Sequence, residues 1–135
     1  MPLTFSVTTA SPTASEVRLG RHTLRFDQPA SHGGGGTGPS PLVVFASASA
    51  ACAHYFLAQF LNAREIDSTD LVVDVTMAKA EEGIPRLGTL DLLVKLPAGV
   101  PQKYAKAIQK IIRQCPVHGT LHTPPEVGLE VIFPD

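Results

Sequence analysis

The sequence contains no tryptophan, two tyrosines and only two cysteines among 135 residues. Its 11 lysines and arginines nearly balance its 12 aspartates and glutamates, and no basic stripe is present to bind nucleic acid. The N-terminus, MPLTFSVTTA, lacks the basic start and the apolar run of a signal peptide. No stretch of roughly 18 residues is free of polar interruption, as a membrane span requires. We therefore expect a cytoplasmic protein that binds neither nucleic acid nor membrane.

The two cysteines, Cys52 and Cys115, lie too far apart in the sequence for a zinc knuckle. A structural disulfide between them is not expected in a cytoplasmic chain. The five histidines are scattered, and His118 and His122, which could share a helical face, have no supporting carboxylate motif. We therefore predict no metal site and no cofactor. Two interpretations of the cysteines remain, a redox-active pair and inert core thiols.

The pattern of residues 40–64 predicts one long, largely buried helix that contains Cys52. Ser40 suits the N-cap, and Pro41 suits the first helical position, where its missing N–H costs nothing. The central run, residues 46–53, has small side chains on every face, so other backbones could approach it closely from all sides. A helix that is apolar on so many faces needs more cover than one subunit offers, which predicts a homodimer.

Alternating apolar residues predict antiparallel strands on both sides of this helix. These strands are expected within residues 3–27, with a turn at Gly20, and at residues 71–79, 84–96 and 126–133. The glycine-rich segment 28–39 precedes the long helix, and we predict that it is flexible because four consecutive glycines offer no side chains to pack. Such a segment could also gate a pocket beside the helix.

Residues 101–115 predict a second helix, whose apolar face ends at Cys115. Pro116 stops that helix and starts a short third one, which places Cys115 at its N-cap. The partial positive charge of a helix start lowers the pKa of a cysteine, so a lowered pKa is expected for Cys115. The order of strands, long helix, strand pair, helices and strand predicts an α+β fold with antiparallel sheets, in a single domain spanning residues 1–135.

Three stretches resemble the OsmC-like and organic hydroperoxide resistance (OsmC/Ohr) family. GTGPSPLVVFASASAAC is similar to the family's entry into a central helix with its first cysteine. GIPRLGTLDLLVKL resembles a strand that begins with a Pro-Arg pair, and CPVHGTL resembles the signature of the second cysteine. The resemblance covers most of the chain from about Gly33 onward and keeps the family's spacing.

This resemblance implies antiparallel sheets around a long central helix and an intertwined homodimer with each active site at the interface. It implies that Cys52 attacks a hydrophobic organic hydroperoxide and becomes a sulfenic acid. Cys115 would then condense with this sulfenic acid to form a disulfide, and a dithiol reductant would restore both thiols. The protein would then be a thiol-dependent peroxidase that acts in oxidative stress.

The chain departs from the family pattern at the start of the long helix. Family peroxidases carry a carboxylate one or two residues after the helix-initiating proline, where it orients an arginine over the reactive thiolate. Leu42 and Val43 occupy those positions here. The candidates for the arginine itself are three residues of the N-terminal strands: Arg18, Arg21 and Arg25. The alternative function is therefore a non-catalytic OsmC-like dimer that binds an apolar ligand or senses redox state.

Overall fold

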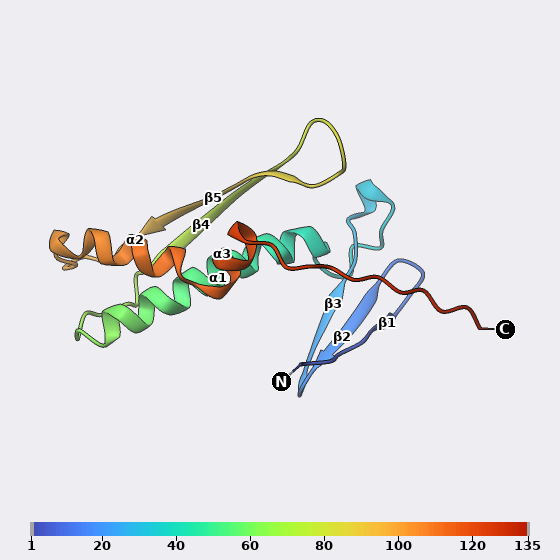
Figure 1. Cartoon of the computed structure of the whole chain (residues 1–135), viewed down its shortest axis with the longest axis horizontal. Coiled ribbons are helices and arrows are strands. Elements are labelled where there is room, and N and C mark those ends of the chain that lie inside the picture. Colours follow the sequence, from blue (N-terminus) through green and yellow to red (C-terminus); the bar gives the residue numbers. More distant parts are fainter. Residues whose placement is uncertain (1, 135) are drawn as a thin grey trace. The chain divides into compact units, whose positions relative to one another are not determined.

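The computed structural model describes residues 2–134, which form two compact units, one ending at Ser47 and the other beginning at Ala48 (Figure 1). In chain order the elements are β1 (Val7–Thr9), β2 (Ser15–Leu19), β3 (His22–Phe26), η1 (Ala30–His32), α1 (Pro41–Asn62), β4 (Val72–Lys79), β5 (Leu87–Lys95), η2 (Gln102–Tyr104), α2 (Ala105–Arg113) and α3 (Pro116–His122). This mixture of helices and antiparallel sheets confirms the predicted α+β class.

The first unit contains a three-stranded antiparallel sheet in the order β1-β2-β3. Its centre is Val17, which is buried and lies in register with Val7 on one side and Leu24 on the other. Gly20 makes the predicted turn between β2 and β3 with a φ of +61°, a backbone conformation that favours glycine. Ladder pairing in β1 begins only at Val7, so residues 3–6 of the predicted alternation lie outside the sheet.

The segment between β3 and α1 is more ordered than its four consecutive glycines predicted. It contains the short 3₁₀ helix η1, and the N–H of Gly36 donates to the carbonyl of Gln28 at 2.9 Å. A Cβ on Gly34 would lie 1.9 Å from that same carbonyl oxygen, and one on Gly38 would lie 2.8 Å from the carbonyl oxygen of Arg25. The expectation that these glycines cannot pack is wrong, because the missing Cβ lets their backbone lie directly against the preceding chain.

Helix α1 confirms the predicted long helix, but the expectation that it is largely buried is wrong for the single chain, because Val43, Phe45 and Tyr55 are exposed. Pro41 takes its first position, and the carbonyl of Ser40 accepts from the N–H of Val44 at 3.1 Å, as an N-cap residue's carbonyl does. Its buried positions repeat every three or four residues: Ala46, Ser49, Ala50, Ala53, Leu57, Phe60 and Leu61. Ala48 and Ala51 are exposed. The small residues are therefore buried along one stripe rather than on every face.

Helix α1 is also the one helix among the described residues long and apolar enough to cross a membrane, judged by length and composition alone. It has 22 residues, and no charged residue interrupts it. The expectation that no stretch meets this requirement was therefore too strict, because the polar residues of the helix, such as Ser47 and Gln59, carry no charge and leave its mean hydropathy at 1.5. The core helix of a soluble protein passes the same test, so the finding is weak evidence for a membrane span.

The second unit packs the C-terminal part of α1 against a hairpin and a second helix. Strands β4 and β5 pair in the predicted way, with Val73 opposite Val94 and Val75 opposite Leu92. The buried cluster consists of Leu57, Phe60, Leu61, Leu71 and Ile108, with Val94, Tyr104, Ile111 and Ile112 packed against it. Helix α2 thus presents the apolar face that its sequence predicted, and the hairpin lies on the same core.

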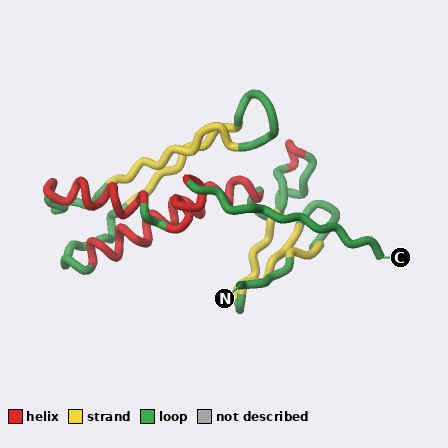
Figure 2. Tube along the Cα trace, in the orientation of Figure 1, coloured by secondary structure: helices red, strands yellow, loops and turns green. Residues whose placement is uncertain are grey.

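The predicted strand at residues 126–133 is wrong. Helix α3 ends at His122, and the chain beyond it is irregular up to residue 134 (Figure 2). Its apolar side chains are exposed, from 66% for Val131 to 92% for Leu129. A strand exists only where a neighbouring strand accepts and donates its backbone hydrogen bonds, and none of the strands found in residues 2–134 pairs with this segment.

Candidate active site

Cys115 occupies the turn between α2 and α3. Its backbone is extended, with φ −66° and ψ 142°, and Pro116 follows at the first position of α3. The Sγ atom of Cys115 accepts a hydrogen bond from the backbone N–H of His118 at 3.4 Å. Only 1% of the residue is exposed. The prediction that Cys115 points inward and caps a third helix is confirmed.

Cys52 lies on α1 and is half-buried, and both cysteines are free thiols. The two side chains meet within the second unit, where Cys115 shares a side-chain hydrogen bond with Cys52. Residues on α1 and at the start of α3 are thereby brought together although 62 residues of chain separate them. The structure therefore makes these two thiols neighbours, which spacing in the sequence could not establish.

Burial raises the pKa of the Cys115 thiol above its usual range. The hydrogen bond from the His118 N–H works in the opposite direction, because it favours the thiolate. The hydrogen bond with Cys52 raises the pKa again, and so does electrostatic repulsion from that thiol when it is ionised. The expected lowering at the helix start is therefore wrong in sign, since loss of hydration outweighs the contribution of the helix N-terminus.

The two thiols differ in exposure and in electrostatic environment. Cys115 is shielded from solvent, and its burial raises the pKa of the thiol. Cys52 is the more accessible of the two and can meet a molecule from solution. Disulfide formation through a sulfenic acid requires two neighbouring thiols, of which one can be reached by the oxidant.

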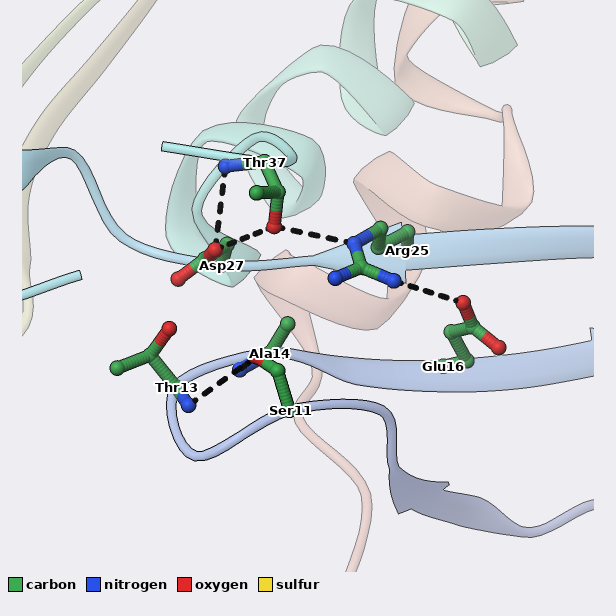
Figure 3. Close-up of polar contacts among 7 residues, drawn as sticks. All are labelled: Ser11, Thr13, Ala14, Glu16, Arg25, Asp27 and Thr37. Atoms are coloured by element: carbon green, nitrogen blue, oxygen red, sulfur yellow. Dashed lines mark hydrogen bonds and ion pairs between the residues drawn. The ribbon is translucent and has the colours of Figure 1, made fainter. Parts of the chain in front are cut away.

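The three candidate arginines all lie in the first unit. Arg18 and Arg21 are exposed on the β2–β3 hairpin. Arg25 is held on both sides: its Nη1 donates to Glu16 Oε1 at 3.0 Å, and its Nε donates to Thr37 Oγ1 at 3.0 Å (Figure 3). Leu42 and Val43, at the start of α1, provide no carboxylate, so the acidic partner of Arg25 comes from β2 instead.

Asp27 is the polar residue that sequence analysis missed. It is 2% exposed, and its carboxylate accepts from the N–H groups of Gln28, Gly35 and Thr37 at 2.7, 3.2 and 3.1 Å and from the Thr37 hydroxyl. Figure 3 shows the bonds from Thr37. The Thr37 hydroxyl bond, followed by these N–H groups, holds the pKa of Asp27 well below its usual range. The sequence does contain a signal for this role, an aspartate directly before a Gly/Thr-rich loop. The carboxylate of such an aspartate can accept hydrogen bonds from the free N–H groups of the loop.

Within residues 2–134, no three His, Cys, Asp or Glu side chains are grouped so that they could hold a metal ion. The chemistry that the described side chains themselves present is that of the two thiols. The molecule is thus an α+β protein with a paired-thiol site between a long helix and the start of a short one.

Comparison with solved structures supports this description of the fold. An OsmC-like protein from Mycoplasma pneumoniae superposes with a TM-score of 0.73 at 19% identity, covering 92% of this chain and 91% of the other. A protein from Psychrobacter arcticus assigned to osmotic stress and detoxification gives 0.79 at 20% identity, with 91% of each chain covered. The organic hydroperoxide resistance protein OhrB of Bacillus subtilis gives 0.62 at 20% identity, covering 90% and 93%. A search of curated proteins found no significant match.

The family model for OsmC-like proteins matches residues 33–130, which is most of the chain. The protein therefore belongs to the OsmC-like family, and the resemblance identified in its sequence is confirmed. The solved structures share its antiparallel sheets and long helix.

Proposed function

We propose that this protein is a thiol-dependent peroxidase that reduces organic hydroperoxides, with Cys52 as the attacking thiol and Cys115 as the resolving thiol. The observation that carries the proposal is the contact between a half-buried and a fully buried thiol that are distant in sequence. Family membership and the hydroperoxide resistance named for a structural relative add support.

The proposed reaction has two steps in the protein. The Cys52 thiolate attacks the terminal oxygen of the hydroperoxide, the O–O bond breaks, and the alkoxide takes up a proton and leaves as an alcohol. Cys52 is now a sulfenic acid. Cys115 then attacks the Cys52 sulfur, the S–O bond breaks, and the Cys115 proton leaves with the hydroxyl group as water. The resulting disulfide is reduced to two thiols by an external dithiol, which becomes oxidised.

We further propose that the substrate is hydrophobic, since the helix carrying Cys52 has apolar side chains along most of its length. The working form would be a cytoplasmic homodimer in which residues 1–135 act as one OsmC-like domain. The large apolar side chains of α1 that remain exposed in one chain support the homodimer, because such residues are usually covered.

The second candidate function is a non-catalytic dimer that binds an apolar ligand or senses redox state. The observation that favours it is the pair of aliphatic residues at the start of α1: Leu42 is half-buried and Val43 is 48% exposed, and neither can orient an arginine. The guanidinium of Arg25, moreover, is already bound by Glu16 and Thr37.

Peroxide consumption and thiol counting separate the two functions. The wild-type protein, treated with one equivalent of an alkyl hydroperoxide, should lose both thiols by mass spectrometry and regain them with dithiothreitol. With excess reductant it should turn over, whereas Cys52→Ser should not. Cys115→Ser should accumulate a sulfenic acid on Cys52 and then higher oxides. Ala51→Ser, at an exposed neighbouring position on α1, is the matched control and should consume peroxide normally.

Two results would contradict the peroxidase proposal. If the wild type keeps two free thiols under excess hydroperoxide, the binding function takes its place. If Cys52→Ser retains turnover while Cys115→Ser loses it, the roles of the two thiols are reversed.

A further inference from the structure

Four exposed cations form one row along α2 and the turn before it: Lys103, Lys106, Lys110 and Arg113. They recur every three or four residues, which places them on one side of the helix. Ile108, on the other side, is buried in the core. The four cations are therefore presented to solvent together, and we call them the basic row.

No carboxylate forms an ion pair with the basic row within residues 2–134. The ion pairs in this part of the chain are made by Arg25 and by Lys95, neither of which belongs to the row. Residues 92–125 contain no aspartate or glutamate. Composition did not reveal this local charge, because acidic residues elsewhere bring the net charge of the chain to −1.

The basic row is partly unfavourable for the helix that carries it. Lys103 and Lys106 lie at the N-terminal end of α2, where the helix dipole favours negative charge, and the first turn contains no acidic residue. Lys110 and Arg113, in the last turn, do complement the dipole. Cations three or four residues apart on a helix nevertheless repel one another. Charges that act against local stability in this way point to a function for the row.

The basic row ends beside the paired-thiol site. Arg113 is the last residue of α2, and Cys115 follows two positions later at the N-cap of α3. The thiol of Cys115 is buried in contact with Cys52, which is the more accessible of the two. A protein bound along the row would therefore lie close to the place where a disulfide between these cysteines has to be reduced.

We propose that the basic row is the docking surface for an acidic face of the protein that supplies the dithiol. This inference rests on the proposed peroxidase function and concerns its reducing step. One thiolate of the dithiol attacks a sulfur of the Cys52–Cys115 disulfide and displaces the other cysteine, and the second thiol then breaks the mixed disulfide. The reductant leaves as a disulfide, and its two protons remain on Cys52 and Cys115. Opposite charges on the two surfaces accelerate their encounter and fix their orientation.

Other anionic partners fit the basic row less well. A nucleic-acid-binding domain typically has a pI above about 9, whereas the pI of this sequence is about 6.5. A basic amphipathic helix binds a membrane by inserting its apolar side, but the apolar side of α2 is packed in the core around Ile108. Two copies of the row would repel each other across a two-fold contact. An acidic protein surface is subject to none of these objections.

Reduction of the disulfide by model dithiols of different charge tests the proposal. The disulfide is formed with diamide, so that the experiment does not depend on peroxide turnover. The probes are the peptide Cys-Gly-Gly-Cys followed by four aspartates, the same peptide followed by four asparagines, and dithiothreitol. Rates are measured at about 0.01 M salt, where charges act over about 30 Å, and at about 1 M salt, where they act over about 3 Å.

The test variant is Lys106→Gln/Lys110→Gln, which removes two charges of the basic row and replaces them with a good helix former. The matched control is Lys79→Glu, at an exposed position of β4, because it changes the net charge by the same amount. At low salt the acidic peptide should reduce the test variant about ten-fold more slowly than the wild type. This difference should disappear at high salt and with the other two probes, and Lys79→Glu should behave like the wild type throughout.

Three results would overturn the proposal. If the test variant and Lys79→Glu give the same rates with the acidic peptide, the row is not a docking surface. If a short DNA duplex or phosphatidylserine vesicles bind the wild type more tightly than the acidic peptide does, and the test variant loses that binding, the partner is not an acidic protein. If the test variant changes the sedimentation of the protein, the row contacts a second copy.

Failure of the peroxidase proposal would be distinguishable from these results. A wild-type protein that forms its disulfide with diamide but not with a hydroperoxide would contradict the peroxidase function. The reduction rates of the diamide-oxidised protein would still decide whether the basic row is a docking surface.

Discussion

The backbone N–H of His118 donates a hydrogen bond to Sγ of Cys115 at 3.4 Å, so one sulfur atom both caps α3 and touches the thiol of Cys52. The atom proposed to resolve the sulfenic acid is therefore also part of the local structure. A disulfide with Cys52 would be formed by the same sulfur atom that caps α3. The stability of α3 and the redox chemistry of the two thiols are therefore linked through Cys115.

The cap should be measurable by comparing two substitutions at Cys115. Cys115→Ala removes the acceptor and should lower the free energy of unfolding by about 1 kcal/mol, the usual cost of losing an N-cap. Cys115→Ser keeps a good N-cap acceptor and should be clearly more stable than Cys115→Ala, although it too cannot form a disulfide. Urea unfolding under reducing conditions gives both values. Equal stability of the two variants would show that the sulfur contributes nothing as a cap.

Asp27 should make the protein sensitive to acid. Its pKa is held well below the usual range in the folded state, so the stabilisation is fully present above the pKa of an unfolded aspartate, about 3.9, and is lost as the pH falls below it. The free energy of unfolding should therefore decline from about pH 4 downward. The Asp27→Asn variant should be less stable than the wild type at pH 7, and its free energy of unfolding should decline less as the pH falls. Urea unfolding between pH 7 and pH 3 measures both.

Asp70→Asn is the control for this acid titration, because Asp70 is an exposed aspartate outside the loop. Its free energy of unfolding should depend on pH in the same way as that of the wild type. A profile for Asp27→Asn that parallels the wild type would contradict the assignment of the acid sensitivity to this carboxylate.

Gly34 should not tolerate a side chain. Its Cβ would meet the carbonyl oxygen of Gln28 at 1.9 Å, so Gly34→Ala must displace backbone and should cost about 1–3 kcal/mol, the range for overpacking. Gly119→Ala is the matched control: no atom lies within 4 Å of its Cβ, and Gly119 lies within α3. That substitution should be neutral or stabilising by up to about 1 kcal/mol. Thermal unfolding that ranks the two variants in the reverse order would refute the close packing of the loop.

The exposed apolar side chains of α1 should hold two copies together. Val43, Phe45, Tyr55 and Phe56 are 48%, 46%, 57% and 36% exposed. Tyr55→Asp should weaken association by about 2 kcal/mol or more, roughly a thirty-fold rise in the dissociation constant, if Tyr55 is a central interface residue. Gln109→Asp, at an exposed position of α2, should leave association unchanged. Sedimentation equilibrium at micromolar concentration measures both. A wild type that sediments as a 14.3 kDa species would contradict the homodimer itself.

The helices were predictable because their signals are local. Pro41 and Pro116 stand at the first positions of α1 and α3, and the spacing of apolar residues along α2 predicts the face that it buries. The pairing of β4 with β5 followed from alternation in two adjacent segments. Such signals depend on residues a few positions apart, and tertiary contacts did not override them here.

The chemistry of the cysteines required the folded chain. Sequence could identify two thiols, each on an inward-facing position, and a resemblance suggested that they meet. Whether they touch depends on how α1 and α3 pack, and the sign of the Cys115 pKa shift depends on a balance between burial and the helix N-terminus. The sequence predicted a lowered pKa because the burial of Cys115 depends on residues that are remote in the sequence.

What the amino-acid sequence determined by itself was the family, the order of the main helices and strands as far as α3, and the two candidate thiols. Only the tertiary structure decided that a buried Asp27 organises the glycine-rich loop, and that residues 126–133 pair with none of the strands in the part of the chain that the structure describes. The physical reason is the same in both cases. A carboxylate and an extended backbone take their final state from the donors and acceptors around them, and those partners are set by folding rather than by neighbours in the sequence.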